Sequence, residues 1–250
     1  MTSWIPGKIV WRELATTDAK KAAAFYSELC GWKITESDMG GGMIYRLLNV
    51  GSKQIGGMYE MRPEQKGMPS TWTGYVSVDD VDAAAKKAKD AGGTVLMEPT
   101  DIPNVGRFAT IKDKEGAITN AFKSSHGDEP AAVPEGGEFC WDSLGTSNVK
   151  SATDFYTKVY AWTVKEFAPG MPYFAAGDLQ IASFMEEPGA HPHWLTYVAV
   201  AKLGESRDRA EKLGAKILMP EIPVPGIGKF AVIADPTGAM IALFEPGPRS

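Results

Sequence analysis

The chain carries one long pattern twice, and this repeat limits the folds that it can adopt. Trp11-Arg12-Glu13-Leu14 returns as Trp141-Asp142-Ser143-Leu144, so the second copy begins 130 positions after the first. A later match pairs residues 106–111 with residues 228–233, which lie 122 positions further on, so copy two is shorter by eight residues between these points. A repeat of this length indicates two copies of a domain and excludes a solenoid of short units.

The repeat predicts two domains in the 250 residues. We expect the first domain over residues 7–124, a linker over 125–137 and the second domain over 138–246. The linker is predicted because this stretch is rich in proline and glycine and has no periodic apolar pattern. Each copy, at about 120 residues, is long enough to bury its own core.

Composition and charge narrow the possible partners and the location. Apolar residues make up 44% of the chain and charged residues 23%, as in an ordinary folded protein. The net charge is −5 and there is no basic run, so we expect no nucleic-acid partner. No apolar run reaches the length of a membrane span and the start has no basic and apolar leader, so we expect a cytoplasmic protein with no membrane partner.

Each copy contains two modules of one strand, one helix and three strands. In copy one the first module is predicted as a helix from Thr17 or Asp18 to Cys30 with strands at 8–15, 32–34, 43–50 and 54–61. The second is predicted as a helix capped by Asp79 or Asp80 with strands at 73–78, 94–97, 107–111 and 117–122. Copy two repeats this order. The fold class is therefore α+β, with curved mixed sheets that bury their helix-facing sides and leave the other faces around a cavity.

Several short motifs accompany this order. Phe25-Tyr26 lies in the first helix, Gly31-Trp32 follows it, and Asp-x-x-Gly occupies the last hairpin at residues 113–116 and 235–238. With four βαβββ modules, the chain resembles the vicinal oxygen chelate superfamily of glyoxalases, bleomycin-resistance proteins and dioxygenases. Within it, the chain most resembles the actinobacterial glyoxalase-like antigen and "hydroxylase" group. The resemblance implies two tandem domains of this type, each with a cavity.

The resemblance also implies a divalent metal held by His and Glu, one from each of four central strands. At those positions copy one has Trp11, Thr73, Asn120 and either Gly56 or Gly57, and copy two has Trp141, Leu195, Ala242 and either Ala182 or Ser183. None of these is an imidazole or a carboxylate. We therefore predict no metal-binding residues and expect no cofactor. A divalent metal held by other residues, which a different alignment would place at the ligand positions, stays open. His191 and His193 are separated by Pro192, which favours a loop over a metal site.

Aromatic side chains recur at positions that share the strand parity of these absent ligands. Such residues would stack on a planar ligand, unless they only fill the cavity. The predicted ligand-binding residues are Trp11, Thr73, Tyr75, Asn120, Phe122, Trp141, Ser143, Tyr197 and Phe244, with Arg107 and Lys229 placed to attract an anionic ligand. Trp32 and Trp162 fall outside this parity and are assigned to the core. Cys30 and Cys140 are expected to be reduced, buried thiols.

Two functions follow as hypotheses. The first is a protein that lacks the usual metal ligands and binds a small planar or aromatic molecule. The second is a lyase, isomerase or hydroxylase-like enzyme, either metal-assisted or using Glu13 as a base, because Glu13 is the one carboxylate expected in either cavity. A structural role with filled cavities, a monomeric or homodimeric state, and the pairing of modules within or between copies stay open at this point.

Overall fold

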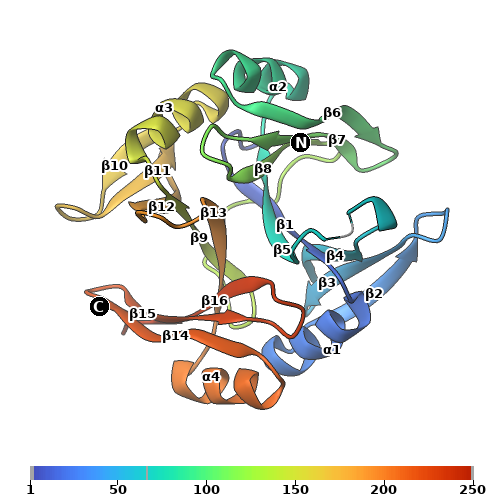
Figure 1. Cartoon of the computed structure of the whole chain (residues 1–250), viewed down its shortest axis with the longest axis vertical. Coiled ribbons are helices and arrows are strands. Elements are labelled where there is room, and N and C mark those ends of the chain that lie inside the picture. The colour runs from blue at the N-terminus through green and yellow to red at the C-terminus, as the bar shows by residue number, and fades with distance from the viewer. Residues whose placement is uncertain (1–2, 66, 249–250) are drawn as a thin grey trace. The chain divides into compact units, whose positions relative to one another are not determined.

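The computed structural model describes residues 3–65 and 67–248. Its helices and strands follow the βαβββ order four times, as the sequence predicts (Figure 1). Module one contains β1 (Ile9–Thr16), α1 (Ala19–Cys30), β2 (Lys33–Asp38), β3 (Ile44–Val50) and β4 (Lys53–Glu60), followed by a short 3-10 turn, Pro63–Gln65. Module two contains β5 (Thr71–Ser77), α2 (Val81–Asp90), β6 (Thr94–Ile102), β7 (Gly106–Lys112) and β8 (Ile118–Ser124).

Copy two supplies the other two modules. Module three contains β9 (Phe139–Thr146), α3 (Val149–Tyr160), β10 (Thr163–Glu166), β11 (Pro172–Ala176) and β12 (Leu179–Glu186). Module four contains β13 (His193–Ala199), α4 (Leu203–Lys212), β14 (Lys216–Val224), β15 (Gly228–Ala234) and β16 (Met240–Pro246). The strands form two eight-stranded mixed sheets, so the predicted α+β class is confirmed. In each module the first and last strands pair in parallel and the other strand pairs are antiparallel.

Helices α1, α2 and α3 begin where a short polar side chain accepts a backbone hydrogen bond, whereas Lys202 before α4 makes no such bond. Asp18 caps α1 by accepting from the backbone N–H of Lys21 at 2.9 Å, and Asp80 and Asn148 cap α2 and α3 in the same way. Of the two residues that the sequence offered as cap for each of the first two helices, Asp18 and Asp80 are therefore the ones that cap them. Gly31 ends α1 with a φ of 72°, a left-handed conformation that suits glycine.

Strand β6 is longer than the sequence predicts. The expected strand covered 94–97, whereas β6 extends over Thr94–Ile102 and contains Pro99. Two register shifts against β7 accommodate the extra length. Most of its side chains are exposed, so the strand has no clear alternation of apolar and polar residues for a sequence reading to find.

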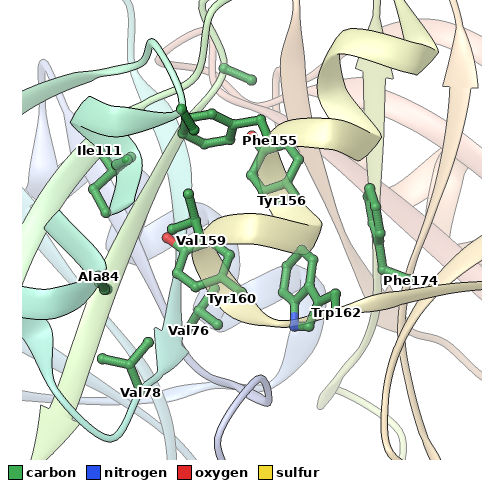
Figure 2. Close-up of a cluster of buried hydrophobic side chains, with 14 of the residues drawn as sticks. Val76, Val78, Ala84, Ile111, Phe155, Tyr156, Val159, Tyr160, Trp162 and Phe174 are labelled. Atoms are coloured by element: carbon green, nitrogen blue, oxygen red, sulfur yellow. The ribbon is translucent and has the colours of Figure 1, made fainter. Parts of the chain in front are cut away.

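Packing divides the described residues into two compact units, and neither unit is one copy of the repeat. The first unit contains residues up to Trp11, Thr73–Ala131 and Asp142–Trp194, so it combines most of module two with most of module three. Helices α2 and α3 contact each other in this unit (Figure 1). Figure 2 shows its core, where α3 packs Phe155, Tyr156, Val159 and Tyr160 near the strand residues Val76 and Ile111.

The second unit contains Arg12–Trp72, Ala132–Trp141 and the residues from Leu195 on, so it combines module one with module four. Its core includes Leu14, Phe25 and Trp32 from module one together with Val198 and Leu203 from module four. The modules therefore pair in two ways. Each eight-stranded sheet joins the two modules of one copy, whereas each core joins a module of copy one to a module of copy two. The boundaries 7–124, 125–137 and 138–246 describe the sequence repeat and stay a prediction.

A buried hydrogen-bonded chain recurs in both units. In the first unit, Trp194 Nε1 donates to the Tyr156 hydroxyl at 3.0 Å, and that hydroxyl donates to Asp113 Oδ2 at 2.9 Å. Burial, followed by the charge of Asp113, raises the pKa of Tyr156 well above its usual value. In the second unit Trp72, Tyr26 and Asp235 make the same chain, with both distances 3.0 Å. The Phe-Tyr motif and the Asp-x-x-Gly motif of opposite copies therefore contact each other.

The structure confirms the core assignment of both tryptophans and corrects one prediction about the cysteines. Trp32 and Trp162 are each 2% exposed. Neither Cys30 nor Cys140 forms a disulfide with another described residue, but both are half-buried, because each lies at the margin of an apolar cluster. Burial nevertheless raises the pKa of the Cys30 thiol to about 12. No helix within residues 3–65 and 67–248 is long and apolar enough to span a membrane.

Candidate functional site

One face of module two carries a group of aromatic and polar side chains. Alternation along the strands sends Val76, Ala109 and Ala121 into the core of the first unit, next to α2. Their neighbours point to the opposite side of the sheet. Strand register places Tyr75 opposite Asn120, Asn120 opposite Thr110, and Phe122 opposite Phe108. We call the set Tyr75, Phe108, Thr110, Asn120 and Phe122 the module-two face.

The three aromatic rings of the module-two face are in contact. The Tyr75 ring centre lies 5.7 Å from that of Phe122 in a T-shaped arrangement and 6.0 Å from that of Phe108. Tyr75 and Phe122 are buried and Phe108 is half-buried. Sequence reasoning found Tyr75 and Phe122 but missed Phe108, although its recurrence as Phe230 in the 106–111 and 228–233 match could have indicated it.

A polar pair lies on the same face beside these rings. The Thr110 hydroxyl donates to Asn120 Oδ1 at 2.7 Å. Asn120 is only 4% exposed, and within the described part of the chain this is the one hydrogen bond of its side chain. The amide nitrogen of Asn120 therefore keeps donors to offer to a ligand. Thr110 was also missed from the sequence, because its role depends on lying opposite Asn120.

The corresponding face of module four is apolar. Tyr197 and Phe230 have ring centres 5.2 Å apart and pack with Leu195, Val232 and Ala242. Val232 and Ala242 lie opposite each other at the positions of Thr110 and Asn120. Trp141 and Phe244, predicted as ligand-binding residues, are half-buried and pack against this cluster. Copy two thus keeps the aromatic residues of copy one and lacks its polar pair.

Module one carries the predicted base in a hydrogen bond. Glu13 lies on β1 directly opposite Gly57 on β4, and its Oε1 accepts a hydrogen bond from the Tyr45 hydroxyl at 2.8 Å. Tyr45 can reach Glu13 because Gly57 has no side chain: a Cβ at this position would collide with the Tyr45 hydroxyl. Sequence reasoning predicted Glu13 and missed Tyr45, which lies on a strand that supplies no ligand in the resemblance.

A second tyrosine lies on the same side of module one. Tyr59 is the strand partner of both Tyr45 and Ala15, and its hydroxyl accepts a hydrogen bond from Gln65 Nε2 at 3.3 Å. Burial raises the pKa of Tyr59, the Gln65 hydrogen bond opposes this, and the charge of Glu13 adds to the increase. Glu13, Tyr45 and Tyr59 therefore form a group of three ionisable side chains on one sheet face.

The equivalent part of module three has no carboxylate at the position of Glu13. Ser143, predicted as a ligand-binding residue, is buried on β9 opposite Ser183 of β12. Tyr173 also lies opposite Ser183, and its ring stacks on Phe167 with ring centres 4.1 Å apart. We call Glu13, Tyr45 and Tyr59 the acid–base group. Because module three has Ser143 in place of Glu13, this group belongs to copy one alone.

The two predicted cations are both engaged by carboxylates. Arg107 binds Asp82 through two nitrogens, at 2.8 and 3.0 Å, and Asp101 at 2.9 Å. These carboxylates raise the pKa of Arg107. Lys229 Nζ lies 3.3 Å from Glu221 and 3.8 Å from Glu245. Neighbouring anions weaken the field that either cation offers to an anionic ligand, and the steering role stays a prediction.

The remaining predicted residues lie on the central strands. Trp11 on β1 and Thr73 on β5 are half-buried and fall within the first unit. Within residues 3–65 and 67–248 there is no group of three or more His, Cys, Asp or Glu placed to hold a metal ion. His193 begins β13, which corrects its assignment to a loop, and its Nδ1 lies 3.0 Å from the His191 carbonyl. The side chains at the expected ligand positions do not fit the metal that the resemblance implies, and we derive no step through one.

Two proteins with known names are similar in sequence to this chain over nearly its whole length. Over 96% of this chain and 95% of the relative, the chain is 33% identical to "Putative glyoxylase CFP32" of Mycobacterium tuberculosis. Over 98% of this chain and 95% of the relative, it is 32% identical to the anthracycline biosynthesis protein DnrV of Streptomyces peucetius.

Solved structures share the fold at low sequence identity. The Mn(II)-bound glyoxalase of Novosphingobium aromaticivorans has a TM-score of 0.66 at 13% identity, with 98% of this chain and 83% of that chain covered. The 2,3-dioxygenase LapB of Pseudomonas has a TM-score of 0.65 at 12% identity, with 100% and 95% covered. The family model for the glyoxalase/bleomycin resistance protein/dioxygenase superfamily matches residues 8–119 and 142–243. With its four βαβββ modules and a match over most of both copies, the chain belongs to this superfamily.

Proposed function

We propose that this protein binds a small planar or aromatic molecule on the module-two face of copy one. The observation that carries the proposal is the Thr110–Asn120 hydrogen bond beside the rings of Tyr75, Phe108 and Phe122. A polar pair made by the buried Asn120 and the half-buried Thr110 costs more folding free energy than the apolar pair that copy two uses at the same place. Module four has Val232 and Ala242 at these positions, which supports the view that folding does not require Thr110 and Asn120.

The chemistry of the face favours one class of ligand. Aromatic rings contact a flat apolar body, and the Asn120 amide can donate to a carbonyl or hydroxyl oxygen at its edge. A fused-ring ketone or quinone offers both features. The Streptomyces relative is named as an anthracycline biosynthesis protein, which makes anthracycline-like ring systems a suitable set of probes. The predicted contributions of Trp11 and Thr73 belong to the same proposal. Trp141, Ser143, Tyr197 and Phe244 lie in copy two, and their predicted role would concern a separate binding site in that copy.

Replacing the polar pair by its copy-two equivalents tests the proposal. We expect Thr110→Val with Asn120→Ala to weaken binding of a fused-ring ketone roughly fivefold, since one net hydrogen bond contributes about 1 kcal/mol. Quenching of tryptophan fluorescence in titrations of both proteins measures the two affinities. The fold should persist, because Val232 and Ala242 occupy the same places in module four.

A matched control is available elsewhere in copy one. Asn49 Nδ2 donates to the Thr35 hydroxyl at 3.3 Å at an exposed site on β2 and β3. Thr35→Val with Asn49→Ala should leave the affinity unchanged. Equal weakening in both double variants, or no binding of any fused-ring probe by the unaltered protein, would count against the module-two face as the binding site.

A second candidate function rests on the Glu13–Tyr45 hydrogen bond of 2.8 Å. We propose, as the alternative, that copy one is a lyase, isomerase or hydroxylase-like enzyme in which Glu13 accepts a proton from the substrate. Tyr45 would hold the carboxylate in place, and the hydroxyl of Tyr59, which is protonated at neutral pH as in any ordinary tyrosine, would donate a hydrogen bond to the substrate. For a lyase or an isomerase, this proton transfer uses only side chains of this chain, whereas a hydroxylation would also need an oxidant such as dioxygen.

Substitution of Glu13 separates the two candidates. If copy one is an enzyme, Glu13→Gln should lower turnover roughly 100-fold or more, because the amide cannot accept a proton. Glyoxalase-type isomerisation and hydroxylation assays on the unaltered protein supply the activity to be compared. Glu64→Gln, an exposed carboxylate in the turn after β4, is the control and should keep full turnover. Undiminished turnover in Glu13→Gln would remove Glu13 from the mechanism.

We also propose a cellular location and the kinds of partner. The net charge of −5 and two cysteines that form no disulfide suit a cytoplasmic protein that acts on small molecules and has neither nucleic acid nor a membrane as a partner. We propose a monomer or a homodimer.

A further inference from the structure

A groove lies on the opposite side of module one from Glu13, beside helix α1. Its volume is about 420 Å³, and α1, β2 and β3 all contribute to it. The lining residues are Lys20, Ala23, Ala24, Ser27, Ile34, Glu36 and Arg46. All of them belong to the second unit, and none is part of the sheet face described above.

Arg46 gives the groove its charge. The residue is 5% exposed, and its strand partners are Glu36 on one side and the fully buried Met58 on the other. A buried guanidinium needs hydrogen bonds or an opposite charge, because transferring it out of water costs several kcal/mol of desolvation free energy. Its one ion pair within the described residues joins Nη2 to Glu36 Oε1 at 2.8 Å. The side chain of Glu36 is 59% exposed, so water weakens this pair.

Arg46 lines the groove and has donors that its ion pair does not use. A guanidinium has five donors, and the pair with Glu36 uses one of its three nitrogens. None of the Arg46 nitrogens is among the buried side-chain atoms that lack a hydrogen-bond partner, so those without a protein partner reach solvent. Lys20 and the hydroxyl of Ser27 line the same space. Two cations therefore face one partly solvated carboxylate.

We propose that this groove binds a small organic anion through a carboxylate or phosphate group held by Arg46 and Lys20. The planar guanidinium matches two oxygens of either group. The volume exceeds that of a bare ion, and Ala23, Ala24 and Ile34 supply apolar contacts for the body of the ligand. The site is separate from the proposed function of the module-two face and from the acid–base group.

Copy two lacks the same features at the equivalent place. Strand register puts Pro172 opposite Glu166, where copy one has Arg46 opposite Glu36. Lys150, the counterpart of Lys20, is bound by Asp154 at 2.6 Å, whereas Ala24 stands at the position of Asp154 in copy one. The βαβββ module thus folds without the arginine, so the burial of Arg46 is a property of copy one and not a requirement of the fold.

Thermal unfolding of the full chain at constant ionic strength tests the proposal with three probes: inorganic phosphate, phenyl phosphate and benzoate. For a probe at 100 times its Kd, we expect the Tm to rise by roughly 5–10 °C. A Tm shift with only phenyl phosphate, or with only benzoate, identifies the preferred anionic group. A Tm shift with inorganic phosphate shows that binding does not need the apolar body of the ligand. No saturable shift with any of the three would overturn the proposal.

Variants locate the site. Arg46→Met should weaken probe binding roughly 10- to 100-fold, as loss of charged hydrogen bonds does. Lys20→Met should weaken it about two- to fivefold, and Glu36→Gln should strengthen it by removing the competing carboxylate. The last two remain informative if Arg46→Met does not fold. Lys150→Met is the matched control and should bind as the unaltered protein does. Equal weakening in Lys150→Met, or unchanged affinity in both Lys20→Met and Glu36→Gln, would overturn the assignment.

Discussion

Replacing Asp113 by alanine is expected to lower the free energy of unfolding by roughly 3–5 kcal/mol. The Asp113 carboxylate is 3% exposed. Its Oδ1 accepts from the backbone N–H groups of Glu115, Gly116 and Ala117 at 2.9, 2.7 and 2.9 Å, which closes the turn between β7 and β8. Its Oδ2 accepts from the Tyr156 hydroxyl. Alanine removes both acceptor oxygens, so all four hydrogen bonds are lost and the Ala117 N–H and the Tyr156 hydroxyl stay buried without partners.

Denaturant unfolding followed by far-UV circular dichroism measures this loss. Asp113→Asn should cost less, because the amide oxygen can still accept from the turn while the charge is lost. Asp90→Ala, at the exposed end of α2, is the control and should unfold near the midpoint of the unaltered protein. Asp235→Ala tests the same chain in the second unit, where Oδ1 accepts from the backbone of Thr237 and Ala239. A midpoint for Asp113→Ala equal to that of Asp90→Ala would contradict the argument.

Replacing Trp162 by alanine is expected to cost about 3–5 kcal/mol through a different mechanism, the opening of a cavity. Its ring lies 5.7 Å from Tyr156 and 5.1 Å from Phe174, centre to centre. Its indole Nε1 donates to the carbonyl of Gly7 at 2.8 Å. Figure 2 shows Trp162 next to Tyr160 and Tyr156 in the core of the first unit. Alanine would remove both the packed ring and the donor to Gly7.

The comparison of Trp162→Phe with Trp162→Ala separates packing from hydrogen bonding. Trp162→Phe keeps a ring and loses the donor, so its unfolding midpoint should fall between those of Trp162→Ala and the unaltered protein. Val133→Ala alters a side chain that is 67% exposed and should change nothing measurable. Trp32→Ala, whose indole donates to the Gly137 carbonyl at 2.6 Å, should match Trp162→Ala. The cavity argument fails if Trp162→Ala unfolds at the midpoint of Val133→Ala.

Local signals explain why much of the fold could be predicted. Asp18 and Asp80 precede their helices by one residue, and each cap is a contact between residues three positions apart. The apolar spacing of Phe25, Tyr26 and Leu29 is likewise contained in one helix. Such patterns show in a single sequence because both partners lie within a few residues of each other. The repeat then extended each local prediction from copy one to copy two.

The candidate site was predictable in part. Strand parity placed Tyr75, Asn120 and Phe122 on one face, because alternation along a strand is a local property. The partners Thr110 and Tyr45 were missed, since the first depends on β7–β8 register and the second on the absence of a side chain at Gly57. Arg46 was missed for a similar reason: an arginine in a strand gives no sign in the sequence that a helix will cover it.

The sequence by itself determined that this protein has two copies of a paired βαβββ module, with helix caps, core tryptophans and aromatic strands at set positions. Only the tertiary structure decided which modules share a core. Tyr156 reaches Asp113 across 43 positions and Tyr26 reaches Asp235 across 209, each joining one copy to the other. The copies have similar apolar faces, so burial alone favours several pairings about equally. The choice among them depends on the fit of particular side chains, and only the folded chain brings those together.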